Sequence, residues 1–514
     1  LLPCVVVING IFIWLQRQKN QVFTIKTLLT VIFFATIFYF NVNTFILPWI
    51  LHENNSVLST NIILKSNLFF ITRLFLVISV YTILVNLWIL IGLNLQKYIE
   101  KLFQEKIPVS FYPLSLLIGI IASSWIVFLL ASMNYLTQTT LLTGIIFFFL
   151  WQFQTLRSIW KNFSNKQFYL QNSSKKLFAL SLVILLISIN LREVIRPVPS
   201  GYDDSTFYYD RVQHIVSGAS NPTNYLPTPF EHLAASISIA TNEPHQMFAL
   251  ALAAFSLFLG TYFFWLLCRK FFDETTSLLG VSFFISIPMF SALTFFETKP
   301  DMLMLACFLM ATYILIEYWS SGKRTLLFLS AFLLGSAITF KLTAFFFVPC
   351  WIVIALLAGK HFQYRLIDQI KTTLLLFFFI ALPLVPWIGQ HFIQRFDSPK
   401  EQPLTLQNQI GEMLSPIQCH NTSLIEDHDR FDHITENSLF DDLLRFPWEI
   451  TMNTRVNSFA TEIGFGFLAI IPFTVFFFRS FKTSFRSSWT WFFGILLLSG
   501  LFSWSMFGKQ ILWY

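Results

Sequence analysis

Charged residues are scarce in this sequence. Only 12% of its 514 residues are Asp, Glu, Lys or Arg, whereas 55% are hydrophobic and 63 are Phe. An average soluble domain carries roughly twice that share of charge. A soluble core cannot absorb so much apolar surface, because chains of this length divide into domains with polar exteriors. The composition therefore excludes an ordinary soluble protein and predicts an all-α polytopic membrane protein.

Cysteine is also scarce, with 5 residues in the whole chain. Only Cys419 lies in a long polar segment, so neither a disulfide framework nor a paired-cysteine metal site is indicated. The chain begins at Leu1 rather than Met and ends at Tyr514, directly after an apolar run. We therefore expect residues to be missing at both termini, and no signal peptide is recognised.

Long apolar runs are what the chain has in abundance. Crossing about 30 Å of hydrocarbon takes roughly 20 apolar residues in a helix, whereas β-barrel strands are half as long and alternate apolar with polar residues. About fourteen runs fit helical spans, which predicts a transmembrane helix bundle. They cover residues 1–15, 27–50, 68–94, 111–133, 137–156, 176–192, 246–268, 276–295, 302–319, 325–340, 342–358, 372–390, 461–478 and 489–506.

Most Lys and Arg residues fall in alternate connecting loops. These basic loops are residues 16–26, 95–110, 157–175, 269–275, 320–324, 359–371 and 479–488. By the positive-inside rule they are cytoplasmic. Most carboxylates lie in the other set, which contains the two large loops, 193–245 and 391–460. The net charge of +7 is thus a difference between two faces and does not indicate a nucleic-acid partner.

The basic segment 157–175 also suggests a domain boundary. We expect residues 1–175 to form an N-terminal block of about five transmembrane helices, whose role the sequence does not reveal. Residues 176–514 would form a second membrane module that carries both large outer loops and continues beyond the last residue.

The first large outer loop carries paired acids, Asp203 and Asp204, ahead of an expected amphipathic helix. Its apolar positions have helical spacing and are 208, 212, 215 and 216. In one interpretation the acids cap this helix, because unpaired N–H groups and the helix dipole stabilise carboxylates there. In the other, one of them is a general base that faces a lipid-borne substrate.

Further along the same loop, residues 222–229 contain three prolines, which predicts a rigid extended stretch along a binding site. Glu231 and His232 follow and could form an acid/base or metal pair. In the second large loop, the run 426–433 mixes His with acids. Such a run fits either a divalent metal site or a solvated loop, and no other cofactor is indicated.

A few charges stand between apolar runs. Lys299 lies close to Glu297 and Asp301, so it could pair with either acid or meet a ligand. Lys341 has no acid beside it in the sequence. It could extend to the outer surface along its apolar stem, or present a cation to a phosphate at the outer leaflet.

Together these motifs resemble GT-C fold glycosyltransferases, namely the bacterial relatives of the protein O-mannosyltransferases and of the lipid A aminoarabinose transferase. The residues that carry the resemblance are Gly201 to Asp204, Phe207-Tyr208, Arg211-Val212, Pro222-Thr223, Pro229 to Glu231, Thr298 to Asp301, Gly335 to Pro349, Pro447 to Thr451 and Ile463 to Pro472. They lie in family order within residues 176–514. In the family the catalytic loop follows the first span, whereas here five further spans precede it.

The resemblance implies an inverting enzyme with a polyprenyl-phosphate-linked sugar as donor and a periplasmic lipid, glycan or protein as acceptor. It implies a base at Asp203, or at Asp204, with Asp301 shaping the site. The cations for the leaving phosphate would be Lys341, Lys299 and Arg211. Further candidate contacts to the substrates are Tyr208, Glu231 and His232. The expected location is the inner membrane of a bacterium, with the active site facing the periplasm.

Two other functions fit parts of the sequence. An O-antigen ligase or polymerase would use a diphosphate-linked glycan and rely on outer-loop residues such as His428 or Arg445. A transporter would place ionisable residues near the midplane and show two matching halves. Among the charges within the predicted spans, Arg73 lies farthest from a span end, and no halves correspond.

Overall fold

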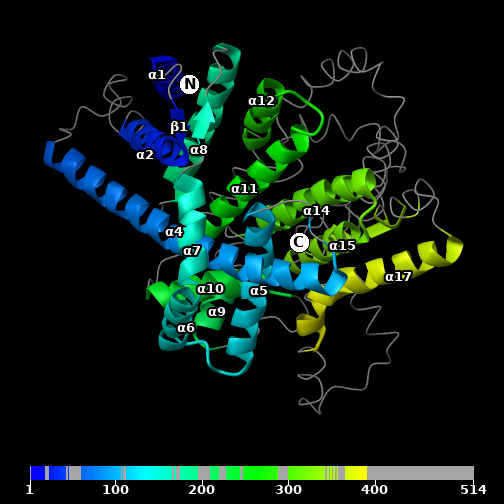
Figure 1. The fold of residues 1–514 in the computed structure, drawn as a ribbon. Coiled ribbons are helices and arrows are strands. Elements are labelled where there is room, and N and C mark those ends of the chain that lie inside the picture. The colour runs from blue at the N-terminus through cyan, green and yellow to red at the C-terminus, as the bar shows by residue number, and fades with distance from the viewer. Residues whose placement is uncertain are drawn as a thin grey trace, which may run out of the picture. The chain divides into compact units, whose positions relative to one another are not determined.

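The computed structural model is almost entirely helical in its described parts (Figure 1). It describes residues 2–17, 22–41, 44, 60–105, 107, 112–164, 167–169, 174–194, 209–218, 227–242, 247–286, 299–341, 344–345, 348–349, 351–353, 356 and 365–389. Its elements are α1 (Leu2–Arg17), β1 (Val22–Thr24), α2 (Ile25–Asn41), α4 (Thr60–Phe103), α5 (Tyr112–Ser132), α6 (Gln138–Trp151), α7 (Phe153–Ser164), β2 (Gln167–Tyr169), α8 (Ser174–Val194), α9 (Tyr209–Val216), α10 (Pro229–Thr241), α11 (Met247–Cys268), α12 (Glu274–Ile285), α14 (Asp301–Ser321), α15 (Arg324–Phe340), α17 (Leu366–Ala381) and the 3-10 helix η4 (Leu382–Leu384).

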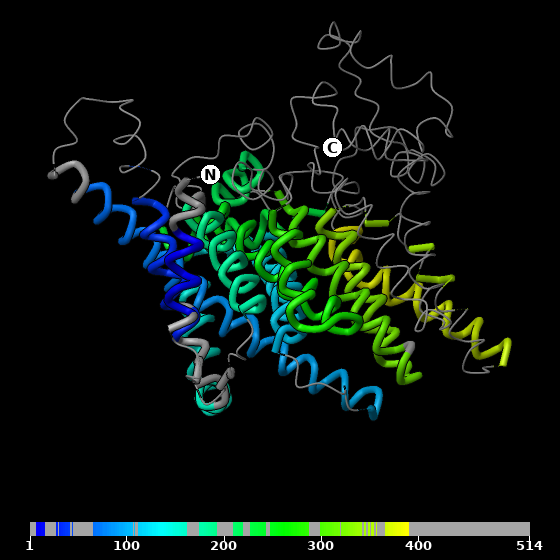
Figure 2. The backbone as a smooth tube through the Cα atoms, turned by 90° about the horizontal axis from the view of Figure 1, so that it is seen from above, coloured from blue at the N-terminus to red at the C-terminus, as the bar shows by residue number. Residues whose placement is uncertain are grey.

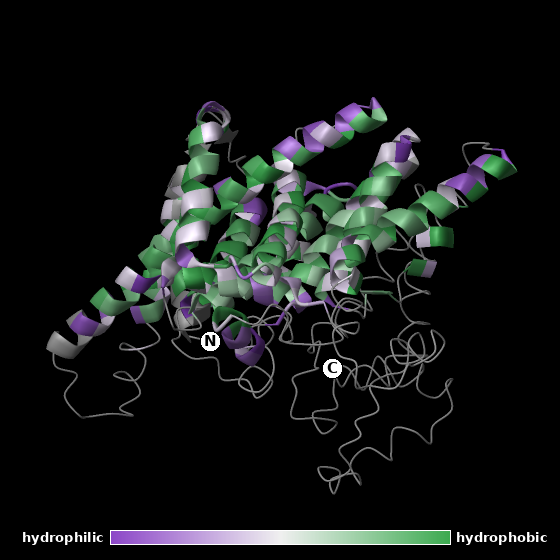
Figure 3. Cartoon of the chain, turned by 90° about the horizontal axis from the view of Figure 1, so that it is seen from below, coloured by the Kyte–Doolittle hydropathy of each residue, from purple (hydrophilic) through white to green (hydrophobic). Residues whose placement is uncertain are grey.

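Within the described residues, 6 helices are long and apolar enough to cross a membrane, or up to 7 if a bent pair counts as one span. They are Lys65–Phe103, Tyr112–Ser132, Ser174–Arg192, Met247–Cys268, Asp301–Tyr318 and Leu366–Gly389. Hydrophobic residues dominate along these helices in Figure 3. The prediction of an all-α polytopic membrane protein is confirmed. The count of about fourteen spans stays a prediction, since 461–478, 489–506 and most of 342–358 lie outside the described residues.

Two of the predicted spans differ from the structure. The run 137–156 is not one helix, because α6 and α7 meet at an angle of 69° on either side of Gln152. The span predicted at 68–94 belongs to the much longer helix α4, which absorbs part of the expected loop 95–110. The polar residues after position 94 are good helix formers, so α4 continues until Gln104 takes a left-handed conformation with φ of 54°.

The chain forms two compact units, each treated by itself below. The first comprises Leu1–Pro222 and Thr228–Tyr313, and the second comprises Thr223–Pro227 and Ile314–Tyr514. The boundary between the two units therefore falls within α14, between Tyr313 and Ile314. The expected boundary after residue 175 stays a prediction.

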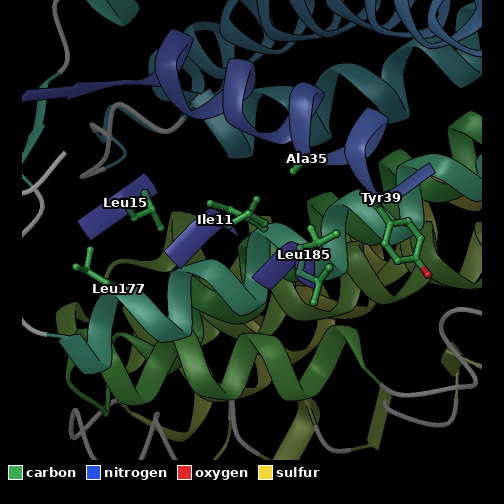
Figure 4. Close-up of a cluster of buried hydrophobic side chains, with 8 residues drawn as sticks. Ile11, Leu15, Ala35, Tyr39, Leu177 and Leu185 are labelled. Carbon is green, nitrogen blue, oxygen red and sulfur yellow. The ribbon is translucent and has the colours of Figure 1, made fainter. Parts of the chain in front are cut away.

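A hydrophobic cluster joins α1, α2 and α8 in the first unit (Figure 4). Side chains from all three helices converge there, which buries the apolar sides of two N-terminal helices on a helix from beyond the basic segment. Its buried members are Val7, Ile11, Leu15, Ala35, Tyr39, Leu177, Ile184 and Leu185. Helices α8, α11 and α12 also pack on one another (Figure 2).

Helices α4 and α5 approach each other closely at two glycines. A β-carbon added to Gly92 would lie 1.6 Å from the carbonyl oxygen of Ser115, and one added to Gly119 would lie 1.8 Å from that of Trp88. Only glycine lets the two backbones approach so closely, as at many helix crossings in membranes. The hydroxyl of Ser115 also donates a hydrogen bond of 2.7 Å to the Gln96 amide oxygen.

Helix α4 also joins α11, far along the chain. The Tyr81 hydroxyl donates a buried hydrogen bond of 2.8 Å to the carbonyl oxygen of Phe248. The rings of Tyr81 and Trp88 lie 5.5 and 5.6 Å from that of Phe255. The N-terminal helices are therefore integrated with downstream helices in the first unit.

Loops of the predicted cytoplasmic set meet at one end of the first unit. Strand β1 pairs antiparallel with β2, so residues from the loops 16–26 and 157–175 lie side by side. The Lys176 ammonium, at the start of α8, lies 2.8 Å from the Glu274 carboxylate at the start of α12. These contacts bring together segments from three loops that the charge pattern assigned to one side of the membrane.

In the second unit, α15 and α17 cross at Gly335, where a β-carbon would lie 2.1 Å from the carbonyl oxygen of Ile380. The Trp351 indole donates a buried hydrogen bond of 2.8 Å to the Ser330 hydroxyl. This packing holds the end of α15, next to Lys341. It also explains why the motif from Gly335 to Pro349 begins with glycine.

Candidate functional site

The first large outer loop contributes two short helices, α9 and α10, that pack on each other. Helix α10 also packs on α5 and α6, beside the turn that connects them. The Gln138 amide at the start of α6 donates a hydrogen bond of 3.4 Å to the carbonyl oxygen of Ala240. Since that turn and this loop were both predicted on the outer side, the structure brings together segments that the charge pattern assigned to one face.

Helix α9 has the buried side that its apolar spacing predicted. Val212 and Ile215 are 0% and 2% exposed, whereas Val216 is 39% exposed. Tyr208, together with the acids Asp203 and Asp204, lies outside the described residues. Their capping or catalytic roles therefore stay predictions.

Helix α10 begins within the stretch 222–229 that was predicted to be extended. Pro229 is its first residue, so the stretch 222–229 is not extended throughout. Proline is favoured at this position, because its missing N–H would have no partner in the first turn anyway. The helix consequently carries Glu231 and His232 in its buried first turns.

An ion pair joins the two helices. A guanidinium nitrogen of Arg211 on α9 lies 3.5 Å from a carboxylate oxygen of Glu231 on α10. The side chains are 14% and 4% exposed, so the pair is largely removed from water. Sequence analysis selected both residues but did not pair them, because they are 20 positions apart and meet only through helix packing.

Burial sets the protonation behaviour of Glu231. Desolvation raises the pKa of Glu231 above its ordinary value of 4.5, and the nearby Arg211 charge partly opposes that rise. A carboxyl group with a raised pKa favours folding below its ordinary pKa, and this contribution disappears as the pH rises through the raised value.

His232 follows Glu231 in the sequence and is fully buried. Its hydrogen bonds fix the orientation of the imidazole ring. Its Nδ1 atom lies 2.7 Å from the carbonyl oxygen of Thr228 and 3.2 Å from the Thr228 hydroxyl. A carbonyl oxygen only accepts, so Nδ1 carries a proton and donates it there. The Phe128 ring of α5 lies edge-on to the imidazole at 5.5 Å. His232 thereby contributes to the packing of α10 on α5.

Replacing Arg211 with Met should destabilise the protein by about 3 kcal/mol near neutral pH, because a buried carboxylate loses its counter-charge. The pKa of Glu231 would rise further, so the loss should shrink as the pH falls toward 4.5. Thermal unfolding of the purified protein in detergent at several pH values would measure both effects.

Glu231→Gln is the matched control, since it removes the titrating group and keeps an amide oxygen that can still accept a hydrogen bond from Arg211. We expect a smaller loss and a flatter pH profile. The double variant should recover part of the stability lost in Arg211→Met. Equal, pH-independent losses in all three variants would contradict the ion pair.

Two more candidates stand at the start of α14 in the first unit. Lys299 and Asp301 are each 8% exposed, and Asp301 is the first residue of the helix. The carbonyl oxygen of Pro300 accepts hydrogen bonds from the N–H groups of Leu303 and Met304. An acid in this first turn is stabilised by the helix dipole, while a buried ammonium requires a compensating partner or ligand.

Lys341 ends α15 in the second unit. It is half-buried, its backbone is extended, and its N–H donates to the carbonyl oxygen of Ala337 at 2.9 Å. The extended backbone turns the chain out of the helix at this lysine. Its position suits a cation, because a helix C-terminus carries partial negative charge.

The metal prediction is not tested, because the run 426–433 lies outside the described residues. Across the described part of the chain, no group of three or more His, Cys, Asp or Glu side chains is placed to hold a metal ion. The described candidates are therefore the Arg211–Glu231 ion pair, His232 next to it in the sequence, Lys299 and Asp301 at the start of α14, and Lys341 at the end of α15.

Comparison with known proteins bears on this region. Residues 229–388 match the family described as dolichyl-phosphate-mannose-protein mannosyltransferase. The match starts at the first residue of α10 and includes Glu231, His232, Lys299, Asp301 and Lys341. Comparisons with curated proteins and with solved structures give no match. The family match confirms the resemblance seen in the sequence motifs and, with the apolar helices, supports a multi-pass membrane glycosyltransferase of the GT-C type.

Proposed function

We propose that this enzyme transfers a sugar from a polyprenyl-phosphate donor to a lipid, glycan or protein acceptor at the outer side of a bacterial inner membrane. The observation that carries the proposal is the family match over residues 229–388, which includes the buried charges at the start of α14. A lipid-linked donor fits a site whose polar groups lie at the ends of apolar helices.

The proposed reaction is a single displacement with inversion. Asp203, or Asp204 in its place, takes the proton of an acceptor hydroxyl, and the acceptor oxygen bonds to the anomeric carbon. The bond between that carbon and the phosphate oxygen breaks, and its electron pair leaves with the phosphate. A base on one face and cations on the other are what this chemistry requires.

The cations proposed to bind the leaving phosphate are Lys341, Lys299 and Arg211. Arg211 already neutralises Glu231 in the resting protein, which weakens its attraction for a second anion. Lys299 is a buried cation within the matched segment, and Lys341 stands at a helix end. We assign the leaving phosphate chiefly to Lys341, with Lys299 and Arg211 as further cations, and the Arg211–Glu231 pair also holds α9 against α10. Asp301 would orient the lysine nearest to it in the chain.

The donor can be identified directly. Lipids that co-purify with the full chain should include a polyprenyl monophosphate when analysed by mass spectrometry. Transfer should be supported by monophosphate-linked sugar and not by a diphosphate-linked glycan. Dependence on the diphosphate donor would favour the ligase or polymerase alternative, and vesicle uptake of a solute without transfer would favour a transporter. A parallel assay with chelator tests the divalent metal.

A further inference from the structure

Helix α7 has features that neither a span nor a loop explains. It has 12 residues, or about 18 Å, which is too short to cross a membrane alone. It departs from α6 at 69°, so if α6 stands along the membrane normal, α7 runs much closer to the membrane plane. The apolar residues Phe153, Leu156, Ile159 and Trp160 occupy one side of the helix, and the other side is polar.

The apolar side of α7 has one buried edge and one exposed edge. Ile159 is 3% exposed, and α7 packs on α2, α4 and α6. Phe153 and Trp160 are 59% and 52% exposed at the far edge of the same side. One edge of α7 is thus fixed to the protein, and the other presents two large aromatic side chains outward. Aromatic rings of this kind are enriched at membrane interfaces.

Two exposed cations border this aromatic edge. Arg157 and Lys161 are four positions apart, so they lie one above the other on the helix surface. On the helical wheel they follow directly after Phe153 and Trp160. Both cations can therefore reach one phosphate while the aromatic side chains enter the apolar layer beneath it. This is the arrangement of interfacial helices that bind anionic membranes.

The surroundings of α7 carry the same charge. Strand β2 follows α7 directly and pairs with β1, which places both basic loops at this end of the first unit. Exposed Lys175 precedes Lys176, whose buried ammonium pairs with the exposed Glu274 carboxylate. A surface with this sign of charge attracts anionic headgroups.

We propose that α7 is an interfacial helix that binds the headgroup phosphate of an anionic membrane lipid through Arg157 and Lys161, with Phe153 and Trp160 as its apolar anchors. The site is separate from the proposed glycosyl-transfer site, and its occupant would stabilise the first unit by fixing α7 against α2 and α4.

Reconstitution of the full chain into phosphatidylcholine nanodiscs, with or without phosphatidylglycerol, would test this proposal. Phosphatidylglycerol should raise the unfolding temperature of the wild type and remain bound in native mass spectrometry. In the double variant Arg157→Gln/Lys161→Gln, the phosphatidylglycerol needed for half of this effect should rise by about tenfold or more. Arg157→Lys/Lys161→Arg, which keeps both charges, should retain the lipid.

The matched control is Lys97→Gln/Lys101→Gln. It removes two exposed cations with the same spacing from α4, in another basic loop. The control should bind phosphatidylglycerol as the wild type does. Equal losses in both double variants, loss of lipid in the charge-conserving variant, or no effect of phosphatidylglycerol on the wild type would overturn the proposal. Equal stabilisation by inorganic phosphate alone would overturn the lipid as the ligand.

Discussion

Asp203→Asn should lower the rate of sugar transfer by roughly 10²- to 10⁴-fold, the usual contribution of a general base. Asn has nearly the same shape as Asp but cannot take a proton, so donor binding should be preserved. The loss should therefore appear in kcat rather than in the KM for the donor. Transfer from a labelled polyprenyl-phosphate sugar, measured in membranes with equal protein levels, gives both parameters.

The neighbouring acid supplies the control. Asp204→Asn makes the same chemical change one residue away and should reduce kcat only slightly if Asp203 is the base. A large loss in Asp204→Asn alone would transfer the role to Asp204. Undiminished transfer by both single variants and by the double variant would remove the base assignment altogether.

Hydropathy predicted most of the described helices, because a membrane span requires a long apolar run whatever packs around it. Hydropathy did not predict the break at Gln152, because this residue stands between two large apolar residues, Trp151 and Phe153. The break follows instead from a change in periodicity, since Arg157 and Lys161 enter the pattern beyond it. A search for amphipathic spacing that continued past the end of the run, across residues 153–164, would have separated α6 from α7.

Local spacing also predicted the burial of Val212 and Ile215 and selected Glu231 and His232 as polar residues of interest. It could not predict that Arg211 pairs with Glu231, because this contact depends on how α9 lies on α10. It likewise assigned no structural role to His232, whose partners are a backbone oxygen and the ring of Phe128. Such contacts are set by tertiary packing, which a single sequence does not encode locally.

The close approach of α4 and α5 leads to the largest expected effect on stability. Gly119→Ala would place a methyl carbon only 1.8 Å from the carbonyl oxygen of Trp88. A backbone oxygen cannot move away as a flexible side chain can, so the two helices must separate. We expect a loss of about 3 kcal/mol or more, with a lower unfolding temperature in detergent. Gly92→Ala, which meets the Ser115 oxygen, should act in the same direction.

Gly144 in α6 offers a matched control, because a β-carbon there meets nothing within 4 Å. Gly144→Ala should be neutral or stabilise the protein by up to about 1 kcal/mol, since alanine favours the helix more than glycine does. Opposite signs for the same substitution in two helices would separate backbone crowding from helix propensity. An unchanged unfolding temperature for Gly119→Ala would mean that α4 and α5 do not meet at these glycines.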